Sequence, residues 1–557
     1  MNTILFTIVL LLLLVAAVAK PVGVYIAKVF SNEPNAAGRM FMPIDRLLYK
    51  VIGIQPKDQT WKEYAISLLF VNTFMILVVY TVFRTQAWLP LNPSALENMD
   101  PALAFNTAIS FMTNTNLQHY SGESGLSYFS QMVAILFMMF AAPASALSVA
   151  IAFMRGMTGK SIGNFFTDFI KSITHVLLPV AVVAGIIFVL LGVPQTLDPT
   201  VTATTLEGEK QEIARGPVAA FLSIKEFGNN GGGFFGVNSA HPFENPNGLS
   251  NMLQIVLMLL LPVSLPFTYS RMIGNKREGR MLFASMSLLF VVFLSIALIS
   301  EQQGNPAFND FTLNSENGYL EGKEVRFGVE MSTLYAIVTT ASETGAVNTM
   351  HDTLTPISGM LALSNMLLNT VYGGVGAGFI NVMMYVLIAV FLSGLMVGRT
   401  PEYVGKKIEG KEMKLIAVTL ILQPLLILGF TAVALTTKLG LDGISNPGFH
   451  GLTQVLYEYT SSAANNGSGF EGLGDATVFW NISTGLVMYI GRFFGLITLL
   501  AVASSLSQKQ LVPQTSGTFK TDTPLFGGIL IGTMFVVGAL TFFPVLVLGP
   551  VAEFLTL

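Results

Sequence analysis

Ten long apolar runs constrain the fold of this chain more than any other feature of its sequence. Each run approaches or exceeds the roughly 20 residues that a helix needs to cross the hydrocarbon of a bilayer. Only 11% of the residues are charged, whereas soluble proteins carry about 25%. We therefore predict an all-α polytopic membrane protein with ten transmembrane helices. The runs lie at about 4–19, 64–83, 127–153, 171–192, 250–272, 281–300, 373–397, 414–437, 479–506 and 525–548.

The first run has two interpretations. Ala17-Val18-Ala19 resembles the cleavage site of a secretory signal peptide. However, no Lys or Arg precedes the run, and Lys20 follows it directly. This polarity favours a retained helix whose N-terminus lies outside the membrane.

Four shorter segments lie between the long runs, and each is too short to cross a bilayer. Each ends in a small polar tripeptide, and three of the four tripeptides end in glycine. We predict four pseudo-symmetric helix–pore loop–helix repeats around a cation pore, with one extra helix at each end. The tripeptides are Asn114-Thr115-Asn116, Asn229-Asn230-Gly231 (followed by Gly232), Glu343-Thr344-Gly345 and Asn465-Asn466-Gly467. The predicted units are an N-terminal helix with a cytoplasmic linker (1–62), pore repeats at 63–153, 171–272, 281–397 and 414–507, and a C-terminal helix (508–557).

The distribution of charge predicts the orientation of these repeats. The five linkers that lack a short segment hold 21 of the 29 Lys and Arg residues. The four linkers that contain a short segment hold 7 Lys and Arg against 21 Asp and Glu. Because basic linkers remain in the cytoplasm, we expect all four short segments and both termini on the outer side. Four loops that enter from one side can share a single axis.

The composition of the tripeptides suits a filter for a monovalent cation. Backbone carbonyls can replace the hydration shell of such an ion without adding full charge. Glycine permits the positive φ angles that turn successive carbonyls the same way, and the partly negative ends of short helices entering from outside favour a cation. Asn116 stands where the other repeats have glycine, so the symmetry is approximate.

Several residues near the predicted filter have two interpretations. Glu343 could attract the cation directly, or it could hydrogen-bond behind the loop, which we favour because a full charge would hold the ion too tightly. Gly373, Gly374, Gly376 and Gly378 open the seventh run, and they indicate either a gate or close helix packing.

Two arginines are further candidates for gating or coupling. Arg492 lies inside the ninth run, where an intramembrane charge is by default a functional candidate. It could block leak or help dislodge the ion, or it could only pair with a carbonyl or another subunit. Arg399 follows the seventh run and is more typical of an interface or an anchor.

The sequence offers no sign of catalytic chemistry. There is no cysteine, and none of the five histidines forms a metal-binding pair at helical spacing. We find no phosphate-binding glycine loop and no Asp-Lys-Thr-Gly phosphorylation motif. We therefore predict no catalytic residue, no ATP site, no nucleic-acid partner and no metal other than the transported ion.

Five groups of motifs along the chain are similar to those of one known family. They are Thr113–Asn116 with Gln118 and Tyr120–Glu123, Asn230–Phe235 with His241–Pro246, Gly398–Tyr403 with Gly405–Lys407, Ser461–Gly467, and Leu548–Glu553. In these motifs the chain resembles the KdpA family, the potassium-binding subunits of bacterial Kdp potassium-importing ATPases. The resemblance implies K⁺ as the bound and transported ion, with the filter at the four tripeptides and Gln118 beside it. It also implies a multi-pass protein of the bacterial inner membrane, in contact with lipid. Its implied partners are a P-type ATPase catalytic subunit and small accessory membrane subunits.

Two other functions remain open. A stand-alone K⁺ channel or symporter of the same four-repeat superfamily would conduct without an ATPase partner. A secondary transporter with inverted repeats would have loops entering from both sides, which the charge pattern disfavours.

Overall fold

The computed structural model describes residues 2–34, 36–306, 319–512 and 519–557. In this part of the chain ten helices are long and apolar enough to cross a membrane, which confirms the predicted fold class. Several spans combine α-helical and π-helical turns. The ten spans are α1 (Asn2–Phe30), α3 (Trp61–Thr85), η2–α6 (Ser130–Leu136, Phe137–Met157), α7–η3–α8 (Phe165–Lys171, Ser172–Leu177, Leu178–Leu190), α10 (Gly248–Ile273), α11 (Lys276–Gln303), α14 (Ala377–Met396), α15 (Gly410–Thr436), α18 (Val478–Ser507) and α19–η8–α20 (Pro524–Leu546, Val547–Val551, Ala552–Thr556).

The spans separate into an inner and an outer group. In the most apolar 18-residue stretch of the span that contains α6, 83% of the residues are buried, and in that of α10 the share is 72%. In the corresponding stretches of α1, α3 and α15 only 22% of the residues are buried. The outer helices expose large apolar side chains such as Leu13, Phe70 and Ile421. A soluble protein rarely exposes contiguous apolar surface on this scale, so the outer helices are suited to lipid contact.

Four short helices occupy the predicted places between spans. They are α4 (Pro101–Met112), α9 (Val218–Phe227), α12 (Gly328–Ala341) and α17 (Phe449–Ala464). Their side chains are largely buried, and each packs against the spans on either side of it. In α4 the start is set by Asp100, whose carboxylate accepts hydrogen bonds from the backbone of Ala102 and Leu103.

The third repeat differs from its prediction. We call the span that follows a tripeptide the returning span of its repeat. In the third repeat it is broken into α13 (Pro356–Leu368) and α14, and α14 begins at Ala377 rather than at 373. The segment between them contains four residues with positive φ, namely Asn369, Tyr372, Gly373 and Gly376. Left-handed residues end an α-helix, so the glycine run separates two helices instead of opening one.

The linker expected at 20–62 is also partly helical. The first span continues to Phe30, and α2 (Ala36–Ile52) follows it. Met40, Leu47 and Val51 on α2 are exposed, while Asp45 is buried. This distribution is typical of a helix that lies along a membrane surface.

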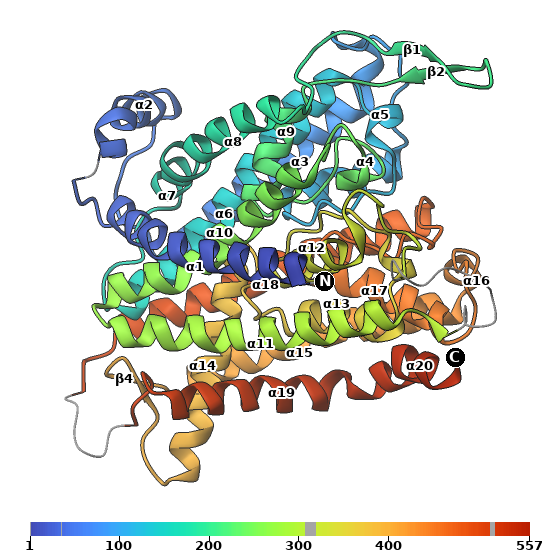
Figure 1. The fold of residues 1–557 in the computed structure, drawn as a ribbon. Coiled ribbons are helices and arrows are strands. Elements are labelled where there is room, and N and C mark those ends of the chain that lie inside the picture. The colour runs from blue at the N-terminus through green and yellow to red at the C-terminus, as the bar shows by residue number, and fades with distance from the viewer. Residues whose placement is uncertain (1, 35, 307–318, 513–518) are drawn as a thin grey trace.

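The remaining elements are small. Two antiparallel hairpins pair β1 (Val201–Thr204) with β2 (Lys210–Ile213), and β3 (Glu402–Tyr403) with β4 (Lys406–Lys407). The β1–β2 hairpin projects from the helical body (Figure 1). Short helical turns complete the described chain at η1 (Gln86–Trp88), α5 (Gly122–Gly125), η4 (Asn238–Ala240), η7 (His351–Thr353) and α16 (Lys438–Leu441).

Candidate functional site

The four tripeptides share one backbone pattern, in which the first and third residues have positive φ. Only glycine adopts this conformation freely, and asparagine adopts it more readily than most other residues. Glu343 is therefore the unusual member of the set. The φ angles are 63° and 58° at Asn114 and Asn116, 49° and 85° at Asn229 and Gly231, 50° and 85° at Glu343 and Gly345, and 56° and 98° at Asn465 and Gly467.

The tripeptides meet one another in a ring, which is defined by contacts at the third residue. A Cβ atom on Gly231 would lie 1.8 Å from the carbonyl oxygen of Thr344. A Cβ on Gly345 would lie 2.1 Å from the Asn466 carbonyl oxygen, and one on Gly467 would lie 1.9 Å from that of Thr115. Repeats two, three, four and one therefore follow each other around the ring, and none of these glycines has room for a side chain.

The first repeat contacts the second through a neighbouring glycine. Asn116 occupies the third position of its tripeptide, and a Cβ on Gly232 would lie 2.9 Å from its Cβ atom. The Asn114 amide also donates a hydrogen bond of 2.8 Å to the Asn229 carbonyl oxygen. These contacts complete the ring, and the residues of the four tripeptides are buried except Gly467, which is partly exposed.

A second layer of residues surrounds the ring and forms hydrogen bonds with the backbone of the second repeat. The side chain of Gln118 accepts a hydrogen bond from the Gly233 N–H at 2.7 Å and donates one to the Gly233 carbonyl at 2.9 Å. The amide of Asn238 donates to the Gly231 carbonyl at 2.8 Å. The family resemblance predicts a place near the filter for Gln118, but nothing in the sequence predicts one for Asn238.

Lys225 is a buried cation within this second layer, and sequence reasoning does not find it. It lies in α9, is fully buried, and forms an ion pair of 2.6 Å with Glu244. Its ammonium group also donates to the Asn238 side chain, which in turn holds Gly231. The pair Lys225-Glu226 within a short apolar helix is the available signal, because buried charge is costly unless it is paired.

Glu343 and Arg492, although distant in sequence, lie close together in space. The Glu343 carboxylate accepts a hydrogen bond of 3.0 Å from the Gly374 N–H and lies 3.8 Å from the Arg492 guanidinium group. Both side chains are about 5% exposed or less. A Cβ on Gly374 would lie 2.4 Å from the carboxylate, so this contact requires glycine.

A small cavity of about 50 Å³ adjoins the ring on the side of this pair. It is lined by Glu343, Arg492, Asn369 and Asn465, together with residues of α14 and α15. One Glu343 oxygen and one Arg492 nitrogen have no hydrogen-bond partner in the described part of the chain. A cavity of this size and polarity is large enough for water.

The other gate candidates lie at different places. A Cβ on Gly373 would lie 2.2 Å from the Gly378 Cα atom, and one on Gly376 would lie 2.7 Å from the Ala146 carbonyl oxygen. This segment is therefore closely packed and directly contacts the third tripeptide through Gly374. Arg399 lies beyond the end of α14, where it is exposed, and it is absent from the cavity lining.

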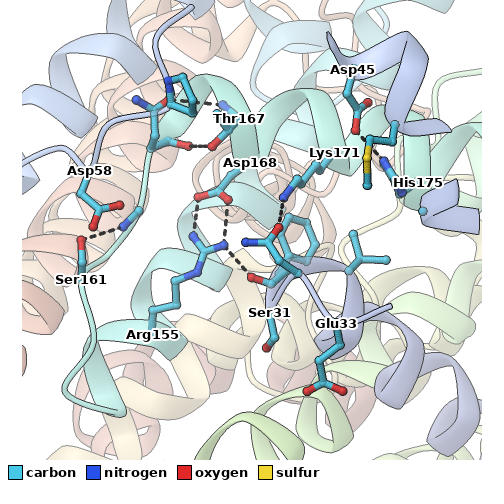
Figure 2. Close-up of a pocket in the computed structure, with 18 of the residues that line it drawn as sticks. Ser31, Glu33, Asp45, Asp58, Arg155, Ser161, Thr167, Asp168, Lys171 and His175 are labelled. Atoms are coloured by element: carbon cyan, nitrogen blue, oxygen red, sulfur yellow. Dashed lines mark hydrogen bonds and ion pairs between the residues drawn. The ribbon is translucent and has the colours of Figure 1, made fainter. Parts of the chain in front are cut away.

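A cleft of about 870 Å³ is separate from the ring. It lies between the end of α1, α2 and α7 (Figure 2). Its walls carry an ion pair between Arg155 and Asp168 at 2.7 Å and another between His175 and Asp45 at 2.7 Å. Its lining mixes acidic and basic groups, and none of the four tripeptides contributes to it.

Comparison with solved structures places the fold in a known class of helical membrane proteins. The solved structure of the potassium transporter TrkH from Vibrio parahaemolyticus has the same fold, with a TM-score of 0.51 and 15% sequence identity. The match covers 87% of this chain and 98% of that one. At this identity the likeness shows the fold alone.

The sequence match is more specific. Residues 9–555 match the family described as KdpA, potassium-transporting ATPase A subunit, and the chain belongs to this family. It is therefore a multi-pass membrane subunit of a potassium-transporting P-type ATPase complex, and potassium is the transported ion.

Proposed function

We propose that the ring of four tripeptides is a selectivity filter, which binds K⁺ from the outer side before ATP-driven import. The observation that carries this proposal is the succession of glycine–carbonyl contacts around the ring, where an added Cβ atom would lie only 1.8 to 2.1 Å from the next carbonyl oxygen. A filter needs backbone carbonyls gathered around one axis. Side chains in place of Gly231, Gly345 and Gly467 would push those carbonyls apart.

The short helices add an electrostatic contribution to this filter. Each ends one or two residues before its tripeptide, so four helix C-termini are directed toward the ring. The C-terminal end of a helix carries a partial negative charge, which falls off within about one turn. Four such ends favour a cation at the ring without placing a full negative charge there.

The Glu343–Arg492 pair is proposed to form a barrier beneath the filter. The guanidinium group balances the carboxylate, so the filter gains no net charge from Glu343. The adjoining cavity of about 50 Å³ is small, and Arg492 would repel a cation that entered it. In this proposal Gly373, Gly374, Gly376 and Gly378 let the segment between α13 and α14 move with Glu343 when the ion passes.

The larger organisation is also proposed from the sequence pattern. The repeats span residues 63–153, 171–272, 281–397 and 414–507, and both termini lie outside the inner membrane. The K⁺ held by the filter passes onward only with an ATPase catalytic subunit, assisted by small accessory subunits and lipid. Tag accessibility on intact cells tests the orientation, and a cytoplasmic C-terminus would contradict it.

Transport by reconstituted protein tests the coupling. Uptake of radiolabelled Rb⁺ is measured in vesicles that hold the full chain with or without its partner subunits and ATP. We expect the chain alone to bind K⁺ without hydrolysing ATP, and we expect uptake to require partners and ATP. Uptake by the chain alone would instead support the stand-alone channel or symporter. ATP hydrolysis by the isolated chain would contradict the subunit assignment.

A further inference from the structure

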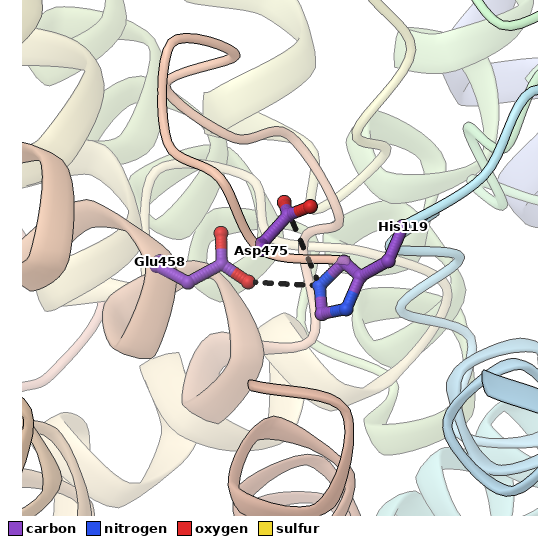
Figure 3. A group of neighbouring side chains, drawn as sticks. All are labelled: His119, Glu458 and Asp475. Atoms are coloured by element: carbon purple, nitrogen blue, oxygen red, sulfur yellow. Dashed lines mark hydrogen bonds and ion pairs between the residues drawn. The ribbon is translucent and has the colours of Figure 1, made fainter. Parts of the chain in front are cut away.

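His119 lies beside the ring, three residues after the first tripeptide, in a cluster that the proposed transport function does not use. Its Nε2 atom is 3.2 Å from a carboxylate oxygen of Glu458 and 3.7 Å from one of Asp475 (Figure 3). Glu458 belongs to α17, and Asp475 belongs to the loop that leads to α18. Three separate segments of the chain therefore converge on one nitrogen atom.

The other ring nitrogen determines which tautomer this arrangement favours. Nδ1 of His119 lies 2.9 Å from the side-chain oxygen of Asn481. An amide oxygen only accepts hydrogen bonds, so Nδ1 carries the hydrogen. In the neutral ring Nε2 would then direct a lone pair at two carboxylates. A positive centre must occupy this point, and it is either a proton or a metal ion.

A comparison with His450 shows that this convergence is specific. His450 also has two acidic neighbours, but they contact opposite sides of its ring. Its Nε2 atom is 3.0 Å from Asp352, and its Nδ1 atom is 2.8 Å from Glu553. Such a ring bridges two carboxylates as an imidazolium and leaves no common point for a metal ion.

We propose that His119, Glu458 and Asp475 form a binding site for a divalent transition metal ion such as Zn²⁺. Zinc binds nitrogen and oxygen ligands at about 2.0–2.2 Å, which separates tetrahedral ligands by about 3.3–3.5 Å. The separations at His119, 3.2 and 3.7 Å, bracket that range. All three ligand atoms lie within 4.8 Å of one another, and water would complete the coordination.

The site has a route to solvent on one side. The side chains of His119 and Glu458 are 0% and 1% exposed, whereas that of Asp475 is 26% exposed. A metal ion would therefore arrive past Asp475, from the face on which the four short helices enter. Buried His and Glu ligands with one accessible carboxylate suit an ion that exchanges slowly.

Metal binding must displace the proton that otherwise fills this point. An imidazole nitrogen binds a metal ion only in its unprotonated form, so the ion and the proton compete for Nε2. Affinity for Zn²⁺ should therefore increase as the pH rises.

An ion at this position would connect the first and fourth repeats just outside the ring. Glu458 lies on the short helix that ends at the fourth tripeptide, and His119 follows the first tripeptide. If the ring is the K⁺ filter proposed above, metal binding stiffens its entrance, and K⁺ and Zn²⁺ alter each other's affinity by the same factor. The metal site itself does not depend on that function.

The test is metal binding to the purified full chain, with an affinity tag that contains no histidine. Isothermal titration with Zn²⁺ and the visible spectrum with Co²⁺ are measured without K⁺ or ATP. The chain has no cysteine, so thiolates cannot contribute to either signal. We expect one ion per chain, with a Co²⁺ spectrum typical of four or five nitrogen and oxygen ligands.

Three variants decide the assignment. His119→Gln and Asp475→Asn should each weaken binding at least tenfold, and His450→Gln is the matched control that should bind like wild type. If His119→Gln fails to fold, the partly exposed Asp475→Asn decides, with thermal melting as the check on its fold. The proposal is wrong if wild type binds no better than Asp475→Asn, or if His450→Gln weakens binding equally. In either case the cluster is an imidazolium with two carboxylates, and the filter proposal is unaffected.

Discussion

The second and fourth repeats differ from the third at the first residue of the tripeptide. Asn229 donates hydrogen bonds to the Thr344 hydroxyl of the next repeat and to the Met258 carbonyl of its own returning span. Asn465 does the same toward Thr115 and Met488. Glu343 instead accepts a hydrogen bond from the Gly374 N–H.

The difference follows from the backbone that faces each residue. In the second and fourth repeats the returning span is a continuous helix, which offers carbonyl oxygens to an amide donor. In the third repeat the span is broken between α13 and α14, and the unwound segment offers a free N–H group. A carboxylate satisfies that donor as an amide satisfies the carbonyls. The residue type at the first position of the tripeptide and the break in the helix are therefore chemically matched.

The largest effect should come from a feature that the second, third and fourth repeats share, which is the absence of room for a side chain at the third position. Gly345→Ala would place a methyl group 2.1 Å from the Asn466 carbonyl oxygen, at a φ of 85°. A left-handed residue with a Cβ costs about 1 kcal/mol or more even without the clash. We expect the K⁺ concentration for half-maximal transport by the complex to rise at least tenfold, with more Na⁺ admitted.

Transport at several K⁺/Na⁺ ratios and matched expression measures this effect. Gly231→Ala and Gly467→Ala should behave alike, and Gly231→Asp should be more severe. Gly248→Ala is the control, because no atom of the described residues lies within 4 Å of its Cβ position. Gly472 is unsuitable, since a Cβ there would lie 2.5 Å from Asp352. If the three alanine variants kept wild-type affinity and selectivity, the tripeptides would be ordinary turns rather than a filter.

A carboxylate should be harmful in the fourth repeat although it is native in the third. Asn465→Asp replaces an amide donor with an acceptor, which then faces the Met488 carbonyl and the Thr115 hydroxyl. The loss of a buried hydrogen bond and the new repulsion should lower the free energy of unfolding by about 2–3 kcal/mol. Thermal melting in detergent measures the change. Asn98→Asp is the control, because the Asn98 oxygen only accepts a hydrogen bond from Ala87. If both variants were equally stable, the residue type at the first position of the tripeptide would not depend on whether the returning helix is continuous.

The Glu343–Arg492 pair should matter for movement of the ion more than for its binding. Arg492→Ala removes the charge that balances Glu343 beneath the ring, so we expect maximal transport or its coupling to ATP to fall about tenfold, roughly 1.4 kcal/mol. K⁺ binding to the purified chain should change less. Because the two side chains lie 3.8 Å apart, Glu343→Gln combined with Arg492→Ala should cost less than the sum of the two single changes. Lost binding with normal turnover at saturating K⁺ would place Arg492 at the filter itself.

The periodic parts of this molecule are easier to predict from the sequence than its irregular parts. Ten spans and four short helices follow from long apolar runs and the polar tripeptides between them. The prediction starts the seventh span at 373 and misses α13 and the break that follows it, because residues 356–368 are apolar but too short for a span and lie inside a long linker. The pairing of Lys225 with Glu244 escapes prediction, because it depends on a fold that local sequence does not encode. The contact of Glu343 with Gly374 likewise requires two segments of the third repeat to meet in space.

The smallest effect should come from Gln118, whose side chain forms hydrogen bonds with a single residue beside the ring, Gly233. Gln118→Glu keeps the oxygen that accepts from the Gly233 N–H but loses the amide that donates to the Gly233 carbonyl. One such hydrogen bond contributes about 1 kcal/mol, so K⁺ affinity should fall about fivefold while maximal transport stays near wild type. Gln118→Ala removes both hydrogen bonds and should weaken binding further. The measurement is K⁺ titration of transport for both variants, with Gln302→Glu as the control, because Gln302 lies at the exposed end of α11. An unchanged affinity in Gln118→Ala would mean that the ring keeps its geometry without this clamp, and that the contacts among the tripeptides are sufficient.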